Sequence, residues 1–155
     1  MSEAGSSWDE LIGLSKEQCE RSYLMRHTGG TFDQASLRTY SDGTSVYSFY
    51  EKGLSFGFLK DGTLDSIDFY NDKTSGGVRA MKTVADSVPL PFGITKQDTG
   101  RSLVTKFGEP KEKGGGFNAK IDIWLRWDNF QVDIDNKSWD QAPNSRWSAF
   151  TIYRP

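Results

Sequence analysis

The sequence holds one cysteine, Cys19, and one histidine, His27, so little chemistry based on these residue types is available. A single cysteine cannot form an intrachain disulfide, which excludes a disulfide-stabilised scaffold. On one helix the two residues would lie roughly 12 Å apart, too far for a nucleophile and its base. We expect no metal and no cofactor, with Cys19 acting as a small apolar residue and His27 as a partly buried core residue.

Basic surface and long apolar runs are also missing. The net charge is −2, so the broad basic surface that nucleic-acid binding requires is not expected. No apolar run of roughly 18 residues is present, so we expect no membrane span. Residues Met1–Ser7 lack both a basic start and an apolar stretch, so they do not resemble a signal peptide. These absences predict a cytoplasmic protein, and a mature form whose signal peptide had been removed would look the same.

Aromatic residues, in contrast, are abundant. They make up 14% of the 155 residues and include five tryptophans, while 35% of the residues are hydrophobic and 26% are charged. This composition is typical of a folded chain long enough for one sizeable core. Large aromatic side chains fill cores and are also enriched at binding surfaces.

Two segments, Gly13–Gly30 and Gly93–Pro110, repeat one pattern at an offset of 80 residues. Each opens with an N-cap residue and a capping-box partner three positions later, and each continues with apolar residues at helical spacing before a glycine. The predicted capping pairs are Ser15 with Gln18, and Thr95 with Asp98. The pattern predicts one helix in each half of the chain.

A β-hairpin and a third strand are expected after each helix. In the second half, alternation predicts that Leu125 pairs with Val132 across an Asp128-Asn129 turn. In the first half, the same reasoning pairs Phe49 with Phe56 and Tyr47 with Phe58 across Lys52-Gly53. The third strands are predicted at 64–70, after an Asp61-Gly62 turn, and at 147–153.

Four further segments complete the prediction. They are a helix over 74–88, an extra strand over 35–40, a mobile loop at Lys111–Gly116 and a long loop at Asn136–Arg146. The predicted fold class is therefore α+β. It consists of two tandem helix–β-hairpin–strand units, 7–71 and 72–155, in a single domain spanning 1–155. Their strands form a curved antiparallel sheet with the helices packed on one face.

The second helix region, Leu90-Pro91-Phe92-Gly93-Ile94-Thr95 followed by Val104 and Phe107-Gly108-Glu109-Pro110, resembles a known motif. The motif is that of the outer-membrane assembly lipoprotein superfamily (SmpA/OmlA-like), and two such units in tandem are similar to the β-lactamase inhibitory protein. The resemblance implies a sheet face that grips a partner protein. Because the lipidated cysteine and the disulfides of that superfamily are missing, it implies neither an outer-membrane anchor nor β-lactamase inhibition.

Strand alternation also predicts an outer sheet face that carries unusually many aromatic residues. Aromatic residues and arginine dominate binding hot spots, although aromatic pairs also stabilise sheets by themselves. The expected partner-binding residues are Tyr50, Tyr70, Trp124, Arg126, Asp133, Trp147 and Tyr153.

The sequence thus favours a protein-binding module that acts by occlusion, such as an inhibitor, an immunity-type protein or an assembly factor. The expected partner is another protein, with a basic surface that acidic side chains such as Asp133 would steer. A carbohydrate- or small-ligand-binding domain is the alternative. A carboxylate-dependent enzyme using residues such as Asp133 and Asp135 is the least favoured hypothesis, so we expect no catalytic activity.

Overall fold

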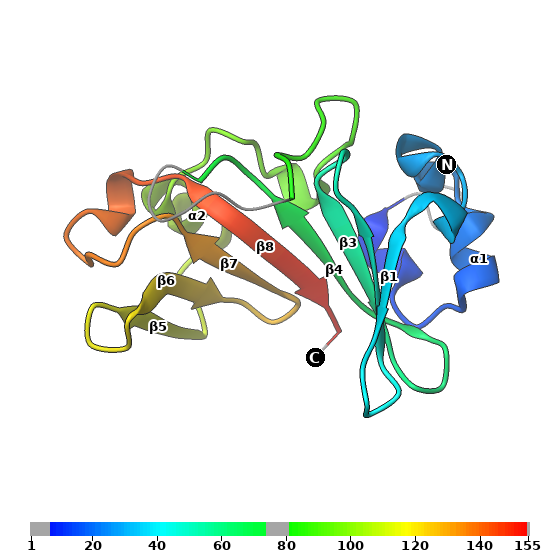
Figure 1. Cartoon of the computed structure of the whole chain (residues 1–155). Coiled ribbons are helices and arrows are strands. Elements are labelled where there is room, and N and C mark those ends of the chain that lie inside the picture. The colour runs from blue at the N-terminus through cyan, green and yellow to red at the C-terminus, as the bar shows by residue number, and fades with distance from the viewer. Residues whose placement is uncertain (1–6, 74–80, 155) are drawn as a thin grey trace.

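A computed structural model describes residues 7–73 and 81–154 of the chain. Its centre is one eight-stranded sheet with the strand order β1-β2-β3-β4-β8-β7-β6-β5 (Figure 1), in which every neighbouring pair is antiparallel. The strands are β1 (Ser36–Thr39), β2 (Ser45–Phe49), β3 (Leu54–Phe58), β4 (Leu64–Tyr70), β5 (Glu112–Gly116), β6 (Ile121–Arg126), β7 (Phe130–Ile134) and β8 (Trp147–Tyr153).

The helical elements are short. The two α-helices are α1 (Lys16–Glu20) and α2 (Gly100–Phe107). The 3-10 helices are η1 (Trp8–Leu11), η2 (Tyr23–Thr28), η3 (Phe32–Gln34), η4 (Pro91–Gly93) and η5 (Ala142–Asn144). The α+β class with an antiparallel sheet is thereby confirmed.

The sheet consists of two four-stranded meanders that meet where β4 pairs with β8. In Figure 1 the strands on either side of this junction diverge as two arms, so the sheet is strongly twisted and curved. The third strands of the prediction are confirmed as β4 and β8. Tandem helix–hairpin–strand units with all helices on one face are not confirmed, since each half contributes four strands and the helical parts of the halves differ.

The predicted helix starts are half right. Ser15 and Gln18 form the expected capping box at α1, but α1 ends at Glu20 and the chain continues as η2. The second box was placed one turn too early, because α2 is capped by Thr99 with Ser102. The Asp98 carboxylate does accept the Thr95 amide proton at 2.8 Å, but in a turn that precedes the helix.

The two hairpin predictions also differ in outcome. Leu125 pairs with Val132 as expected. In the first half Phe49 pairs with Leu54 and Tyr47 with Phe56, so the predicted register was wrong by two residues, while each side chain kept its face. The reason is a longer turn, in which Gly53 has φ +77 and its amide donates to the Phe49 carbonyl.

Other segments correct or confirm the prediction. The extra strand is confirmed as β1, and Lys111–Gly116 is not a mobile loop, because most of it forms β5. Of the helix predicted over 74–88, residues 74–80 lie outside the described residues and 81–88 are not helical.

The core lies on one face of the sheet and takes side chains from both halves. A buried row crosses the strands through Phe49, Leu54, Phe69, Phe150, Val132 and Leu125. Trp8 packs against Phe69 with ring centroids 5.7 Å apart, and Phe107 of α2 packs against Phe130 at 5.0 Å. Helical residues from each half therefore cover the same apolar side of the sheet, which leaves the alternate residues on the other side.

Candidate functional site: the polar face of the sheet

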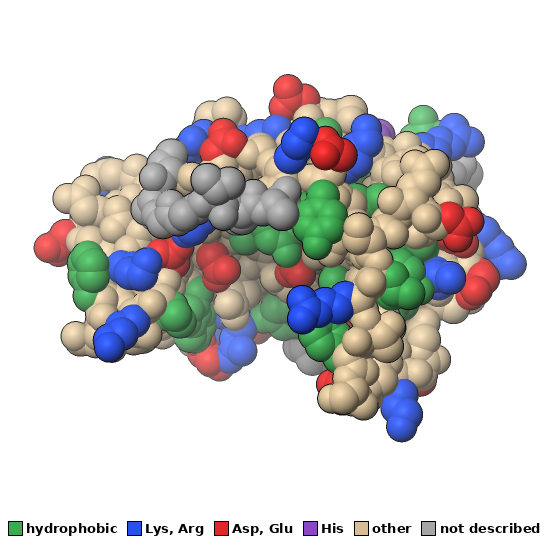
Figure 2. All heavy atoms as spheres, viewed as in Figure 1, with side chains coloured by type: hydrophobic (Ala, Val, Ile, Leu, Met, Phe, Trp, Pro, Cys, Tyr) green, Lys and Arg blue, Asp and Glu red, His purple; other side chains and the backbone are tan. Residues whose placement is uncertain are grey.

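Polar side chains form a continuous row on the face opposite the core. Residues that lie directly opposite each other in neighbouring strands share a face, so the row can be followed by register across all eight strands. It runs through Ser36, Ser48, Ser55, Asp68, Thr151, Gln131, Arg126 and Glu112. We call this side the polar face, and Figure 2 shows acidic, basic and hydrophobic side chains interspersed on the surface seen in the view of Figure 1.

A second row on the polar face brings together three of the predicted binding residues. It runs through Tyr70, Ala149, Asp133, Trp124 and Gly114. The side chains of Tyr70, Asp133 and Trp124 are half-buried, so each is accessible in part. A carboxylate thus lies between two aromatic side chains, separated from the tyrosine by a small alanine.

The remaining expected residues occupy different positions. Arg126 lies in the polar row and forms an ion pair with Glu112 on β5. Tyr153, at the end of β8, donates from its hydroxyl to the Trp127 carbonyl at 3.3 Å. Tyr50 lies in the turn after β2 and is 42% exposed.

The placement of Trp147 on this face was wrong. Its side chain is fully buried on the core side, where its indole N–H donates to the Thr95 carbonyl at 2.8 Å. The cause is a β-bulge in β8, since Asp133 pairs with Ala149 but the next residue, Ile134, pairs with Trp147. One extra residue, Ser148, reverses the alternation at the start of the strand.

Asp68 occupies the middle of the sheet, on β4 beside the junction with β8. Its carboxylate accepts hydrogen bonds from the Thr151 hydroxyl and, at 3.3 Å, from the Ser55 hydroxyl. Burial raises the pKa of Asp68, and these two hydrogen bonds only partly oppose the rise. Asp68 is not among the binding residues expected from the sequence, because its burial depends on the pairing of β4 with β8.

Asp133 is the second carboxylate without a cation. Among the described residues no ion pair involves it. Burial raises the pKa of Asp133, and the charges of Asp122 and Asp68 add to the rise. A hydrogen bond with Gln131 and, to a smaller extent, the charge of the nearby Lys73 oppose it. Asp68 and Asp133 are therefore acidic groups that would gain from a cation supplied by a ligand.

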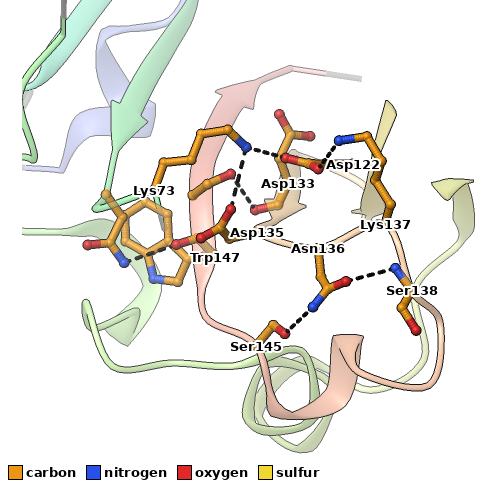
Figure 3. Close-up of polar contacts among 11 residues, drawn as sticks. Lys73, Asp122, Asp133, Asp135, Asn136, Lys137, Ser138, Ser145 and Trp147 are labelled. Carbon is orange, nitrogen blue, oxygen red and sulfur yellow. Dashed lines mark hydrogen bonds and ion pairs between the residues drawn. The ribbon is translucent and has the colours of Figure 1, made fainter. Parts of the chain in front are cut away.

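Lysines neutralise the neighbouring carboxylates (Figure 3). The Lys73 ammonium lies 2.5 Å from Asp122 and 3.4 Å from Asp135, and Lys137 lies 3.3 Å from the other oxygen of Asp122. Burial disfavours the charge of Lys73, but the hydrogen bond and the charge of Asp122, with a contribution from Asp135, outweigh burial and raise its pKa. No local pattern indicates Lys73 as a site residue, because it follows β4 and reaches Asp122 on β6 only through the fold.

A metal-binding cluster and an activated thiol are both missing from the described residues. In the part of the chain that the structure describes, no group of three or more histidine, cysteine or acidic residues could hold a metal ion. Cys19 is buried in α1, where burial, with a smaller effect of Glu20, raises its pKa to about 12, so its thiol is a poor nucleophile. The polar face offers hydrogen-bonding groups, two cation-free carboxylates and partly exposed aromatic rings.

Comparisons with known proteins give a fold but no family. No protein-family model and no curated protein matches the chain. A crystal structure of an extracellular protein containing a SCP domain from Bacillus anthracis str. Ames is similar, with a TM-score of 0.56, 6% identity and 99% coverage of this chain. A cysteine-rich secretory protein from Staphylococcus aureus subsp. aureus Mu50 aligns over 93% of this chain with a TM-score of 0.47 and 11% identity.

This chain spans less than half of either matching structure, 47% and 44% respectively. The first similarity shows a shared fold, and it replaces the expected resemblance to the outer-membrane assembly lipoproteins and the β-lactamase inhibitory protein, which is wrong. The motif behind that resemblance covers η4, α2 and the glycine that ends α2, which is a local pattern and does not define a fold. The expectation of a cytoplasmic protein is also contradicted, because the structure that shares the fold is described as extracellular.

No helix within residues 7–73 and 81–154 combines the length and the apolar character needed to cross a membrane.

Proposed function

We propose that this chain is a binding domain without catalytic activity, and that its polar face holds a partner protein by occluding part of the partner's surface. The observation that carries the proposal is the row of Tyr70, Asp133 and Trp124, in which a carboxylate without a cation lies among partly exposed aromatic rings. Aromatic side chains lose little entropy on binding, so a surface of this kind can give high affinity.

The charge of the polar face supports a partner with a basic surface. Asp68 and Asp133 lack cations among the described residues, and burial raises the pKa of both carboxyl groups. A lysine or arginine from the partner would stabilise the ionised form. Affinity should therefore rise as the pH increases through the raised pKa values and should fall as salt is added.

We also propose an extracellular setting, which is how the similar Bacillus anthracis protein is described. The lone thiol is compatible with such a setting, since Cys19 is fully buried and protected from oxidation. The chain would act as one domain, 1–155, that arose by duplication of units 7–71 and 72–155. The sheet order, with two four-stranded meanders meeting at β4 and β8, supports this origin.

The test is affinity purification with the full chain, followed by measurement of binding to the recovered partner. Asp133→Asn and Tyr70→Ala should each weaken binding about tenfold or more, as expected for hot-spot side chains. Tyr23→Ala is the matched control, because Tyr23 is exposed on η2 and lies outside the polar face. Equal binding by all three variants, with each correctly folded, would contradict the proposal.

A second candidate is carbohydrate binding. Trp124 and Asp133 lie directly opposite each other on β6 and β7, and an aromatic ring beside a carboxylate can stack on a sugar while accepting hydrogen bonds from its hydroxyls. Binding to a glycan array that is lost in Trp124→Ala, with no protein partner recovered, would favour this candidate.

A further inference from the structure

A groove on the core side of the sheet lies next to the free edge of β5. It has a volume of about 380 Å³ and separates α2 and η5 from the strands β5, β6 and β7. Its deepest lining residues, Ile123, Leu125 and Ile134, are themselves buried, and the partly exposed Trp139 forms an accessible wall. Ligand-binding pockets in proteins begin at about this volume, roughly 300 Å³. We call it the β5 groove.

The groove exists because β5 brings no apolar side chain to this face. Lys113 pairs with Leu125 and therefore shares the core face with it. The residues that follow Lys113 are glycines. A further strand beside β5 would direct alternate side chains towards this face, next to Lys113 and the accessible wall of the groove.

The edge of β5 is held in a fixed shape despite its three glycines. A Cβ atom on Gly114 would lie 2.5 Å from the Trp124 indole, and one on Gly116 would lie 2.8 Å from the indole nitrogen of Trp139. The two tryptophans thus pack closely against the glycine backbone. β5 ends the sheet order, and among the described strands only β6 pairs with it (Figure 1). Its outer edge over Glu112–Gly114 is therefore free to pair with another strand, whereas the irregularity between Gly114 and Gly116, where Gly115 and Gly116 have positive φ, ends regular pairing.

The charged side chains that line the β5 groove indicate which kind of segment it would bind. Arg101 of α2 and Lys113 line the groove, and no ion pair of the described residues involves either of them. Glu109 lines the groove as well, so the lining carries a net positive charge. A second copy of this chain would bring its own Lys113 to the same edge, and the two ammonium groups would repel each other. The occupant must instead supply a carboxylate.

We propose that β5 and the β5 groove bind an extended segment of another protein by β-strand addition, and that this segment alternates apolar with acidic side chains. Its backbone pairs with the outer edge of β5. Its apolar side chains pack in the groove against Trp139 and Val104, and its carboxylate faces Lys113 and Arg101. Main-chain hydrogen bonds supply affinity in this mode of recognition, and the pockets for alternate side chains supply specificity. The surface is separate from the polar face.

The test uses the full chain, labelled with ¹⁵N, and short capped peptides that alternate valine with glutamate. NMR titration should give saturable shifts of the Glu112–Gly116 amide signals and of the Trp139 indole N–H signal. A peptide with lysine in place of glutamate should bind about tenfold more weakly, since like charges then meet at the groove. A peptide with N-methylated amides along one edge should not bind, because it cannot form the backbone ladder.

A charge swap completes the test. Lys113→Glu should weaken binding of the glutamate peptide about tenfold and strengthen binding of the lysine peptide by a similar factor. Lys111→Glu is the matched control, because Lys111 is exposed just before β5 and does not line the groove. The proposal is overturned if the N-methylated peptide binds as well as the parent, if both variants weaken binding equally, or if no peptide shifts the β5 signals at millimolar concentration.

Discussion

Trp147 fixes the start of β8 to the segment that precedes α2. Its side chain is fully buried, its ring packs edge-on against Phe150 with centroids 4.8 Å apart, and its N–H donates to the Thr95 carbonyl. Trp147→Phe should remove part of the buried ring and one of the two hydrogen bonds to that carbonyl, which also accepts from the Asp98 amide at 3.1 Å. The two losses together should cost about 1–3 kcal/mol of unfolding free energy. Urea denaturation measures the change. Trp139→Ala, at a half-exposed tryptophan, should cost less; a larger cost there would contradict the assigned burial.

Cys19 should be chemically silent in the native protein. The side chain is fully buried, and burial, with Glu20, raises the pKa of its thiol to about 12, so almost no thiolate exists at about pH 8. Reaction with a disulfide reagent should therefore proceed only at the rate at which the chain unfolds, and should accelerate as urea is added. Modification in native buffer as fast as in concentrated urea would rule out this placement.

Two aspartates should affect the pH dependence of stability in opposite directions. Lys106, Ser102 and the Thr95 amide donate hydrogen bonds to Asp98, and these outweigh burial and lower the pKa of its carboxyl group. Its stabilising contribution is present above the ordinary value of 3.8 and is lost as the pH falls through the lowered pKa. Asp98→Asn should thus cost about 2 kcal/mol near neutral pH and little in acid.

For Asp133, whose pKa is raised, stability changes with pH in the opposite direction. The folded state holds the proton more tightly than the unfolded state, so stability decreases as the pH rises from the ordinary value of 3.8 through the raised pKa. Asp133→Asn should be more stable than the parent chain near neutral pH and equal to it in acid. Denaturation curves at several pH values compare both variants, and parallel pH profiles for the two would refute the assigned environments.

At the scale of elements, β5 shows why three successive glycines can belong to a strand. Trp124 packs on Gly114 and Trp139 on Gly116, so the missing side chains make room for two indoles. Gly114→Ala should displace the Trp124 ring and cost about 1–3 kcal/mol of unfolding free energy, as overpacking does.

A double-mutant cycle isolates this contact. In a Trp124→Ala background the alanine at position 114 should cost less than about 1 kcal/mol, because the clashing ring is gone. Gly57→Ala on β3 is the control, since its added Cβ would meet only the end of the Ser66 side chain, at 3.0 Å. An additive cycle would show that Trp124 does not pack on Gly114.

Local patterns predicted those elements whose own residues determine them. Alternation located β4 and β8 and kept Phe49 and Leu125 on the core face, and the box of Ser15 with Gln18 began α1. The patterns failed where distant residues decide. The bulge at Ser148 depends on pairing with β7, and the strand at Gly114–Gly116 depends on two tryptophans from elsewhere in the chain.

In the candidate site, too, the sequence predicted what local residues determine and missed what distant residues determine. Strand parity placed Tyr70, Trp124 and Asp133 on one face, because parity needs only the sequence of each strand. It could not indicate that Asp68 would lie buried at the junction of the two meanders or that Lys73 would reach Asp122, since both depend on the strand order.

At the scale of the whole molecule, the pairing of β4 with β8 is the one contact among the described strands that joins the two meanders. Phe69 and Phe150 lie opposite each other there and stack with their ring centroids 4.8 Å apart. Each ring also packs against a tryptophan of its own half, since Phe69 contacts Trp8 and Phe150 contacts Trp147. We therefore expect the chain to unfold as one cooperative unit.

Phe150→Ala tests that expectation. Removing a buried phenylalanine should cost about 3–5 kcal/mol of unfolding free energy. If the junction couples the halves, hydrogen exchange should accelerate by the same factor in β3 and in β7, because both are released by the same global opening. Leu103→Ala, on α2 in the second half, provides the comparison. Exchange that accelerates in β7 alone for Phe150→Ala would mean that the two meanders open independently, and the chain would then be two domains that share a sheet.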